Sequence, residues 1–185
     1  GRLSTAAGPF KFHDPELKFA TGFGREEAAR AMARVVDILK VQPETDTPDL
    51  VRATVDLADL YTLWNDPRAT ATYREAWLLM GSDEVYAGLR HELFGVPVRL
   101  LPASMAVRFP NPYNGDKDHL YVELEYKVSE NGRAGRVEIV DSNVPQHQTW
   151  TLRRKLYSAR FRPRMNDGEV VTTEGMRIRE AHAID

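Results

Sequence analysis

The chain has 185 residues, of which 42% are hydrophobic and 28% are charged, and its formal net charge is -2. This balance is typical of a globular protein with one medium domain or two small ones, and it excludes a mainly disordered chain. The chain carries 11 basic and 15 acidic residues before Gly95, and 14 basic and 12 acidic residues from Gly95 onward. Neither half has the concentrated positive charge that phosphate binding needs, so nucleic acid is excluded as a partner. The absence of cysteine excludes disulfides, thiolate metal sites and a cysteine nucleophile.

The N-terminal residues show no targeting pattern. No apolar run reaches the ~18 to 20 residues that a membrane helix requires, and the charged-then-apolar pattern of a signal peptide is missing. Because the chain starts at Gly1 rather than Met, we expect a processed or trimmed form that has lost an export signal or membrane anchor upstream. Residues 1–22 are expected to form an irregular arm, since Gly8-Pro9 and Asp14-Pro15 interrupt any regular element.

Four helices are predicted between residues 25 and 94. In the first, over 25–41, apolar residues recur every three or four positions. The second covers 49–64. The third covers 67–80 and follows a tight turn in which Asp66 is the predicted cap and Pro67 the first helical residue. The fourth covers 82–94, with Ser82 as its N-cap and Gly95 as its terminator.

The second and third predicted helices carry small and aromatic residues where two antiparallel helices would approach closely. These residues are Ala58, Tyr61, Ala69, Tyr73 and Ala76. Their spacing resembles a tetratricopeptide repeat, although the turn is one residue short and Gly81 stands near the usual closing proline. A single repeat cannot bury its own face, so the first and fourth helices would be its neighbours. A generic three- or four-helix bundle explains the spacing equally well.

A β-hairpin is predicted over residues 119–142. Every even position from Leu120 to Val128 is apolar, which is typical of a strand with one buried face. The Asn131-Gly132 pair predicts a tight turn, because both residues accept positive φ. The return strand runs toward Ser142. Upstream, the alternating apolar residues at 96–101 predict a short extra strand within the proline-rich linker at 95–113.

A helix and a last strand are predicted to complete the chain. The helix covers 146–157 after Pro145, and its apolar side consists of Trp150, Leu152, Leu156 and Tyr157. The last strand covers 170–182 and follows the turn signal Asn166-Asp167-Gly168.

The order of these C-terminal elements carries a family resemblance. The second strand ends in Asp141-Ser142, and the helix leads into Ala159–Pro163, a segment in which Phe161 lies between two arginines. Over residues 96–182 this pattern resembles the C-terminal domain of TonB, the periplasmic energy transducer. Phe109-Pro110 lies where that family usually carries an aromatic-proline pair. The resemblance implies a small antiparallel sheet crossed by one helix.

An α+β chain in three parts is therefore expected. Residues 1–22 would be an irregular arm, residues 23–95 a helical, tetratricopeptide-like or bundle domain, and residues 96–185 a TonB-like domain.

No residue pattern for catalysis or cofactor binding stands out. No two of the five histidines have the i, i+4 spacing that would place them around a metal on one helical face. Asn114, Asp116, Asp118 and Glu125 match a calcium-loop register, but the glycine of its sharp turn is missing, so a solvated loop is the favoured interpretation. An enzymatic alternative would use Glu123 and Glu125 as a carboxylate pair, without a partnering histidine or nucleophile. We predict no cofactor, no metal and no enzymatic activity.

The last strand is the candidate binding site. In the TonB family the closing strand is a sheet edge to which an extended peptide of the outer-membrane partner adds. Carried over to this chain, the resemblance implies a peptide-binding edge at Val171, Thr173, Gly175, Arg177 and Arg179. Four alternatives stay open: the edge is blocked by Phe109-Pro110, covered by the helical domain, paired in a homodimer, or protected by its own arginines.

A second candidate surface is a basic patch for an acidic partner. Its residues are Arg153, Arg154, Arg160 and Arg162. The solvated side of a helix and its exit explain the same arginines, because scattered surface charge is the ordinary case.

Two functions are compatible with these features. The first is a non-enzymatic periplasmic adaptor that binds a protein or peptide in envelope transport or assembly. The alternative is an energy transducer of the TonB type, which couples the inner membrane to outer-membrane receptors and whose membrane anchor lies outside this sequence. In both cases we expect a periplasmic location, no nucleic acid, no membrane span within these residues, and a homodimer as an open alternative.

Overall fold

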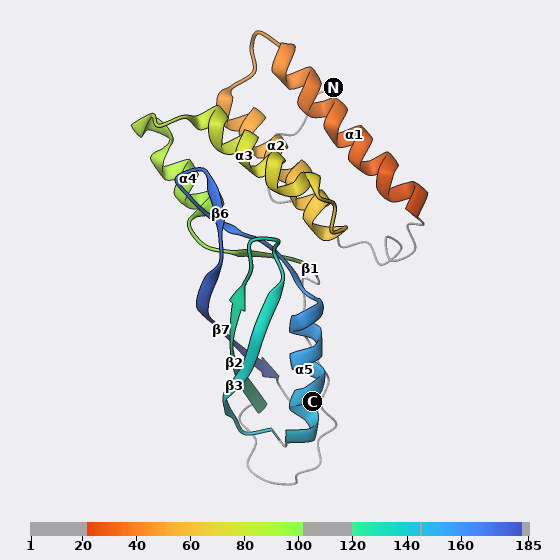
Figure 1. Ribbon diagram of the computed structural model, residues 1–185, viewed down its shortest axis with the longest axis vertical. Helices are drawn as coiled ribbons and strands as arrows, with labels where there is room; N and C mark the ends of the chain where they lie inside the picture. The colour runs from red at the N-terminus through yellow and green to blue at the C-terminus, as the bar shows by residue number, and fades with distance from the viewer. Residues whose placement is uncertain (1–21, 102–119, 145, 183–185) are drawn as a thin grey trace. The chain divides into compact units, whose positions relative to one another are not determined.

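The computed structural model describes residues 22–101, 120–144 and 146–182 (Figure 1). It combines helices with small antiparallel sheets, which confirms the mixed α+β class at that level. The chain divides into two compact units, residues 1–81 and residues 82–185. Each unit is described separately below.

The described part of the first unit consists of three helices, as the sequence predicts. They are α1 (Gly22–Val41), α2 (Thr47–Leu63) and α3 (Arg68–Met80), and α2 packs against both of the others. Ala58 and Ala76 are fully buried, as expected for small residues where two helices approach closely. The buried hydroxyl of Tyr73 donates to Asp59 Oδ1 at 2.7 Å and lies 3.0 Å from the Thr62 hydroxyl, so burial does not leave it unsatisfied.

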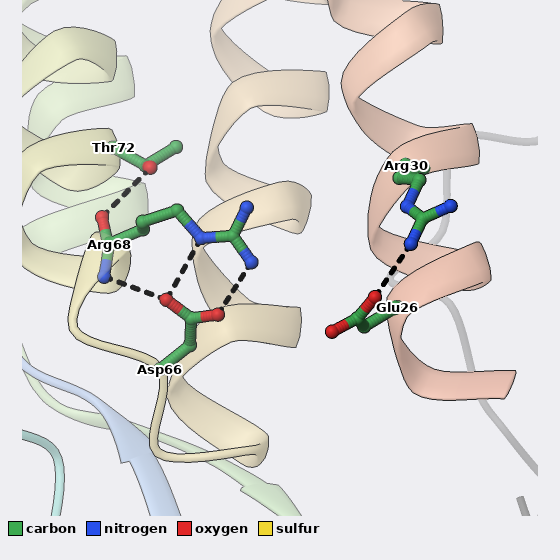
Figure 2. A network of polar contacts seen from close by, with 5 residues as sticks. All are labelled: Glu26, Arg30, Asp66, Arg68 and Thr72. Atoms are coloured by element: carbon green, nitrogen blue, oxygen red, sulfur yellow. Dashed lines mark hydrogen bonds and ion pairs between the residues drawn. The ribbon is translucent and has the colours of Figure 1, made fainter. Parts of the chain in front are cut away.

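The turn between α2 and α3 is fixed by one carboxylate (Figure 2). Asp66 Oδ1 accepts a hydrogen bond from the Arg68 backbone N–H at 2.9 Å, as the sequence predicts, but α3 begins one residue later than predicted and Pro67 occupies its N-cap position. The Arg68 guanidinium returns two further bonds to this carboxylate, 3.0 and 2.6 Å long, and its carbon lies 4.3 Å from the centre of the Tyr61 ring. The hydrogen bond from the Arg68 side chain lowers the pKa of Asp66. The Glu26–Arg30 ion pair of α1 lies across from this turn in Figure 2.

The helix predicted over 82–94 differs from expectation in two ways. It consists of a short 3-10 turn (Glu84–Tyr86) followed by α4 (Ala87–Phe94), and its cap is Asp83 rather than Ser82, because Asp83 Oδ1 accepts from the Val85 N–H at 3.1 Å. It also belongs to the second unit, so the boundary falls at Gly81 instead of Gly95. Gly95 is the C-cap of α4, as predicted, and a Cβ at this position would lie 2.5 Å from the His91 carbonyl oxygen.

The central feature of the second unit is a three-stranded antiparallel sheet in the order β3-β2-β7. Its strands are β2 (Leu120–Val128), β3 (Ala134–Ser142) and β7 (Thr173–His182), and β2 and β3 form the predicted hairpin. The expectation for the turn was wrong in one respect. Only Gly132 has positive φ, at 69°, and Asn131 does not. The Gly132 N–H donates to the Ser129 carbonyl at 2.9 Å, as in a turn that ends in a left-handed glycine rather than in the two-residue Asn-Gly type.

The hydrophobic core of this unit lies between the sheet and α5 (Gln146–Ser158), which runs alongside the hairpin (Figure 1). The even positions of β2 from Val122 to Val128 are buried as predicted, with Val122, Leu124 and Val128 fully inaccessible. From α5, Leu152 and Leu156 fill the other side of the core. Trp150 does not, because its exposed fraction is 63%, and the prediction of four apolar residues on one buried side was therefore wrong for Trp150 and partly wrong for Tyr157, which is 45% exposed.

Two small ladders complete the second unit. The predicted linker strand is β1 (Val98–Leu101), which pairs with β4 (Arg160–Arg162). The predicted single closing strand is divided: β6 (Glu169–Val171) folds back on β5 (Arg164–Asn166), and only then does β7 begin at Thr173. The turn of the β5–β6 hairpin takes positive φ at Asp167 and Gly168, which is why the turn signal produces a separate two-stranded ladder.

Candidate functional site

The candidate site is the edge of β7 that faces away from β2. It is one of the two edges of the three-stranded sheet. From Met176 to His182 the residues of β7 pair one by one with Tyr126 to Leu120, without a break in register. Within the residues that the structure describes, β7 pairs with β2 alone. A regular edge strand offers unpaired backbone N–H and C=O groups on its other side, and these groups are a template for a further strand.

A bulge marks the start of this regular stretch. Val128 pairs with Thr173, and Tyr126 pairs with Met176, so β7 has one more residue than β2 over this interval. Gly175 lies within the interval and has a φ of 67°. Positive φ in an inserted residue is typical of a glycine bulge. Gly175 therefore sets where the usable edge begins.

The opposite edge, β3, is irregular. Its register with β2 shifts twice, once beside Val140 and once beside Arg136, and Arg136 has a positive φ of 48°. Bulges of this kind interrupt the repeat of backbone groups that a new strand would need. The helix α5 also packs against β3. Of the two edges, β7 is the one suited to accept a strand.

The predicted edge residues do not all lie on this edge. Thr173, Gly175, Arg177 and Arg179 belong to β7, but Val171 belongs to β6 and pairs with Arg164. The expectation for Val171 was therefore wrong, because the chain turns between the two strands.

The two arginines of β7 lie over the sheet instead of projecting past its edge. Arg177 Nε donates to Glu125 Oε2 at 2.9 Å, and its Nη1 lies 3.8 Å from Glu123 Oε1. The Arg179 guanidinium carbon lies 4.0 Å from the centre of the Tyr121 ring, at cation–π distance. Both contacts are made with β2, the central strand. The cationic groups therefore do not stand in the path of a strand that approaches β7 from outside.

Tyr121 links this outer face to the other edge of the sheet. Its hydroxyl donates to Asp141 Oδ2 on β3 at 2.8 Å. The hydrogen bond to a carboxylate stabilises the protonated phenol and raises the pKa of Tyr121.

The inner face of β7 is apolar. Met176 and Ile178 are half-buried and pack against the core beside Tyr126 and Leu124, their partners on β2. Because part of their surface stays accessible, they can contact an apolar side chain of an added strand on this face. On the outer face, the same strand would meet Arg177 and Arg179.

The carboxylates proposed for an enzymatic alternative form ion pairs with an arginine of β7. Glu123 and Glu125 both face Arg177 on the outer side of the sheet. Among the described residues, no group of three His, Asp or Glu side chains could hold a metal ion. The first three residues of the calcium-loop register lie outside the described residues.

The predicted basic patch is not a single surface. Arg162 is buried, and its Nη1 donates to the Leu93 carbonyl at 3.4 Å. Arg160 Nη1 donates to the carbonyls of Ser158 and Ala159 at the end of α5, and burial, with a contribution from Arg133, lowers its pKa. These two arginines therefore stabilise the fold. Arg154 on α5 is exposed, and Arg153 lies 5.8 Å from the centre of the Trp150 ring.

Comparisons with known proteins do not place the chain in a family. No family model matches it, and no curated protein matches it at a significant level. Among the described residues, no helix is long and apolar enough to cross a membrane.

Proposed function

We propose that this chain is a non-enzymatic protein-interaction module whose β7 edge binds an extended peptide by adding it as a fourth strand. The observation that carries the proposal is the contrast between the regular β7 edge and the bulged β3 edge. Main-chain hydrogen bonds would supply affinity, and alternate side chains would supply specificity.

The resemblance to the TonB C-terminal domain gives the proposal a cellular setting. A hairpin, one helix across its inner face and a closing strand beside the first strand of the hairpin are compatible with that resemblance. In that setting the protein works in the periplasm as an adaptor in envelope transport or assembly, and the peptide belongs to an outer-membrane or periplasmic protein.

The alternative is an energy transducer of the TonB type. The same edge would then transmit force from the inner membrane to an outer-membrane receptor, and this role requires a membrane helix and a spacer upstream of these residues. The upstream sequence of the gene distinguishes the transducer from the adaptor, whereas peptide binding at β7 is common to both.

Hydrogen exchange of the full chain tests the proposal. Synthetic extended peptides from the periplasm-facing segments of outer-membrane receptors serve as probes. Binding at the edge should slow the exchange of alternate backbone amides between Met176 and His182, because those N–H groups face away from β2 in the free protein. Slower exchange on β3, or in α1 to α3 alone, would contradict the proposal.

A pair of proline variants locates the binding groups. Adjacent residues of an edge strand direct their N–H groups to opposite sides, so one of Arg177→Pro and Ile178→Pro removes an outward group and the other removes a bond to β2. The variant that loses an outward N–H group should stay folded and lose peptide binding. The variant that loses a bond to β2 should be less stable. Val140→Glu on the β3 edge is the control, and it should leave peptide binding unchanged. Full binding by the folded proline variant would rule out strand addition at β7.

A further inference from the structure

The first unit carries an apolar stripe that no described element covers. Four exposed residues on α1 form it, namely Ala28, Ala31, Val35 and Ile38. Other residues of α1 make the contact with α2: Ala29 and Val36 are buried there, and Met32 and Leu39 are half-buried beside them. The apolar side of α1 is therefore wider than its contact with α2 requires.

The spacing of the stripe is that of a helix–helix seam. Its members follow one another at three, four and three residues, the a/d repeat by which two helices interlock. The exposed side of a surface helix is normally polar. Val35 and Ile38 are 44% and 56% exposed, so the stripe leaves large aliphatic groups in water.

The stripe lies on the side of α1 that faces away from α3. Lys40 marks the other side, because its Nζ lies 2.5 Å from Glu75 Oε1 of α3. At 100° per residue, Lys40 and the stripe are on different sides of the α1 axis. The fourth helix that the sequence predicted for this unit belongs to the other unit, so the described residues of the first unit provide no further helix to cover the stripe.

We propose that this stripe is a homodimer interface, in which α1 packs antiparallel against α1 of a second copy. The argument for a second copy is the order of sizes along the stripe: the two alanines come first, and valine and isoleucine follow. A two-fold axis near residue 33 places Ala28 opposite Ile38 and Ala31 opposite Val35, so every large side chain meets a small one. Such pairing fills space evenly and uses the whole stripe.

A parallel arrangement fits less well. It would place Ile38 against Ile38 and Ala28 against Ala28, which crowds one end of the seam and leaves a gap at the other. The antiparallel dimer has one electrostatic consequence: Arg34 lies beside the axis and faces the Arg34 of the second copy. Because like charges repel less in salt, the dimer should become tighter as ionic strength rises.

Sedimentation velocity of the full chain over a wide concentration range tests the proposal. The wild-type chain should dimerise reversibly. Val35→Glu and Ile38→Glu should each weaken the dimer by at least about tenfold, equivalent to 1.4 kcal/mol, because each buries a charge in the seam. The matched control is Leu78→Glu on α3, which changes an aliphatic residue of the same unit that is 76% exposed. It should leave the dimer unchanged.

Engineered cysteines test the direction of packing, since the chain has no cysteine of its own. In an oxidised mixture of the Ala31→Cys and Val35→Cys proteins, the antiparallel seam favours mixed disulfide dimers, whereas a parallel seam favours Ala31→Cys pairing with itself. The proposal fails if the chain is monomeric at every concentration, if the glutamate variants dimerise normally, or if Ala31→Cys pairs mainly with itself. It also fails if Val35→Glu lowers the melting temperature of a monomer, which would mean that the stripe is an internal contact.

Discussion

The two edges of the three-stranded sheet are built from the same central strand and yet differ in regularity. β7 follows β2 without a break over the seven pairs from Tyr126–Met176 to Leu120–His182, whereas β3 departs from β2 twice. The comparison shows that the two edges differ in the repeat of their backbone groups, which an added strand would need, and that the sequence pattern alone does not reveal this difference. Arg177 and Arg179 looked like protective charges in the sequence, but both lie over β2.

The largest expected effect on stability comes from truncating a buried side chain of β2, the strand with which both edge strands pair. Leu124 is fully buried on β2 between Ile139 of β3 and Ile178 of β7. Leu124→Ala should lower the free energy of unfolding by about 2–5 kcal/mol, from lost burial and the cavity left behind. Denaturant titration measures this change, and hydrogen exchange should show both edges opening together. Val140→Ala at the 48%-exposed edge position is the control and should cost little. Opening of one edge alone would show that the edges do not depend on a common core.

A smaller loss of stability should affect the β7 edge and leave the β3 edge unchanged. Gly175→Ala places a side chain at a φ of 67°, where nothing lies within 4 Å but the backbone conformation is strained, at a cost of roughly 1–2 kcal/mol. Hydrogen exchange should then accelerate on β7 and not on β3. Gly135→Ala on β3 is the matched control: its φ is not positive, and the added Cβ would make an ordinary 3.5 Å contact with Lys127. It should cost nothing or stabilise slightly. Equal losses for both variants would remove the role assigned to the Gly175 bulge.

Removing the ion pair on β7 should have a still smaller effect. Arg177 is 60% exposed, so solvent screens its bonds to Glu125 and Glu123, and Arg177→Ala should cost no more than about 1 kcal/mol. The loss should shrink in high salt. The control on the other edge is Arg136→Ala: Arg136 Nε lies 3.5 Å from Glu138 Oε1, and both side chains of this pair are more exposed than those of the Arg177 pairs. A gain of self-association in Arg177→Ala that Arg136→Ala does not show would mean that Arg177 protects the edge after all.

Sequence patterns predicted the elements of both units well. Period-two alternation identified β2, and the spacing of Ala58, Tyr73 and Ala76 identified the close contact of α2 with α3, because burial of one face leaves a periodic trace. The hydrogen bond of Asp66 at the start of α3 was also predictable, since its donor, Arg68, is two residues away.

The errors occurred where the outcome depends on distant partners. The division of the last strand depends on β5 pairing with β6, and the burial of Arg162 depends on a carbonyl of α4 that is 69 residues away. Neither leaves a local signal in the sequence. For the candidate site, the position of the strand was predictable, but its regularity was not, because register shifts are set by both strands of a pair.

The smallest expected effect concerns Tyr121, which contacts both edge strands: its hydroxyl donates a hydrogen bond to Asp141 on β3, and Arg179 on β7 covers its ring. The bond to Asp141 raises the pKa of Tyr121 above the ordinary value of 10.0. A phenol with a raised pKa in the folded state contributes stability that is fully present below its unfolded pKa and is lost as pH rises through the folded pKa. Asp141→Asn should therefore lower the pKa of Tyr121, as measured by NMR titration of the ring, and weaken the loss of stability at alkaline pH. Arg179→Ala should act in the opposite direction, because the guanidinium favours the phenolate. If both substitutions shift the pKa of Tyr121 in the same direction, the contacts of Tyr121 with Asp141 and Arg179 do not have the opposing effects assigned to them.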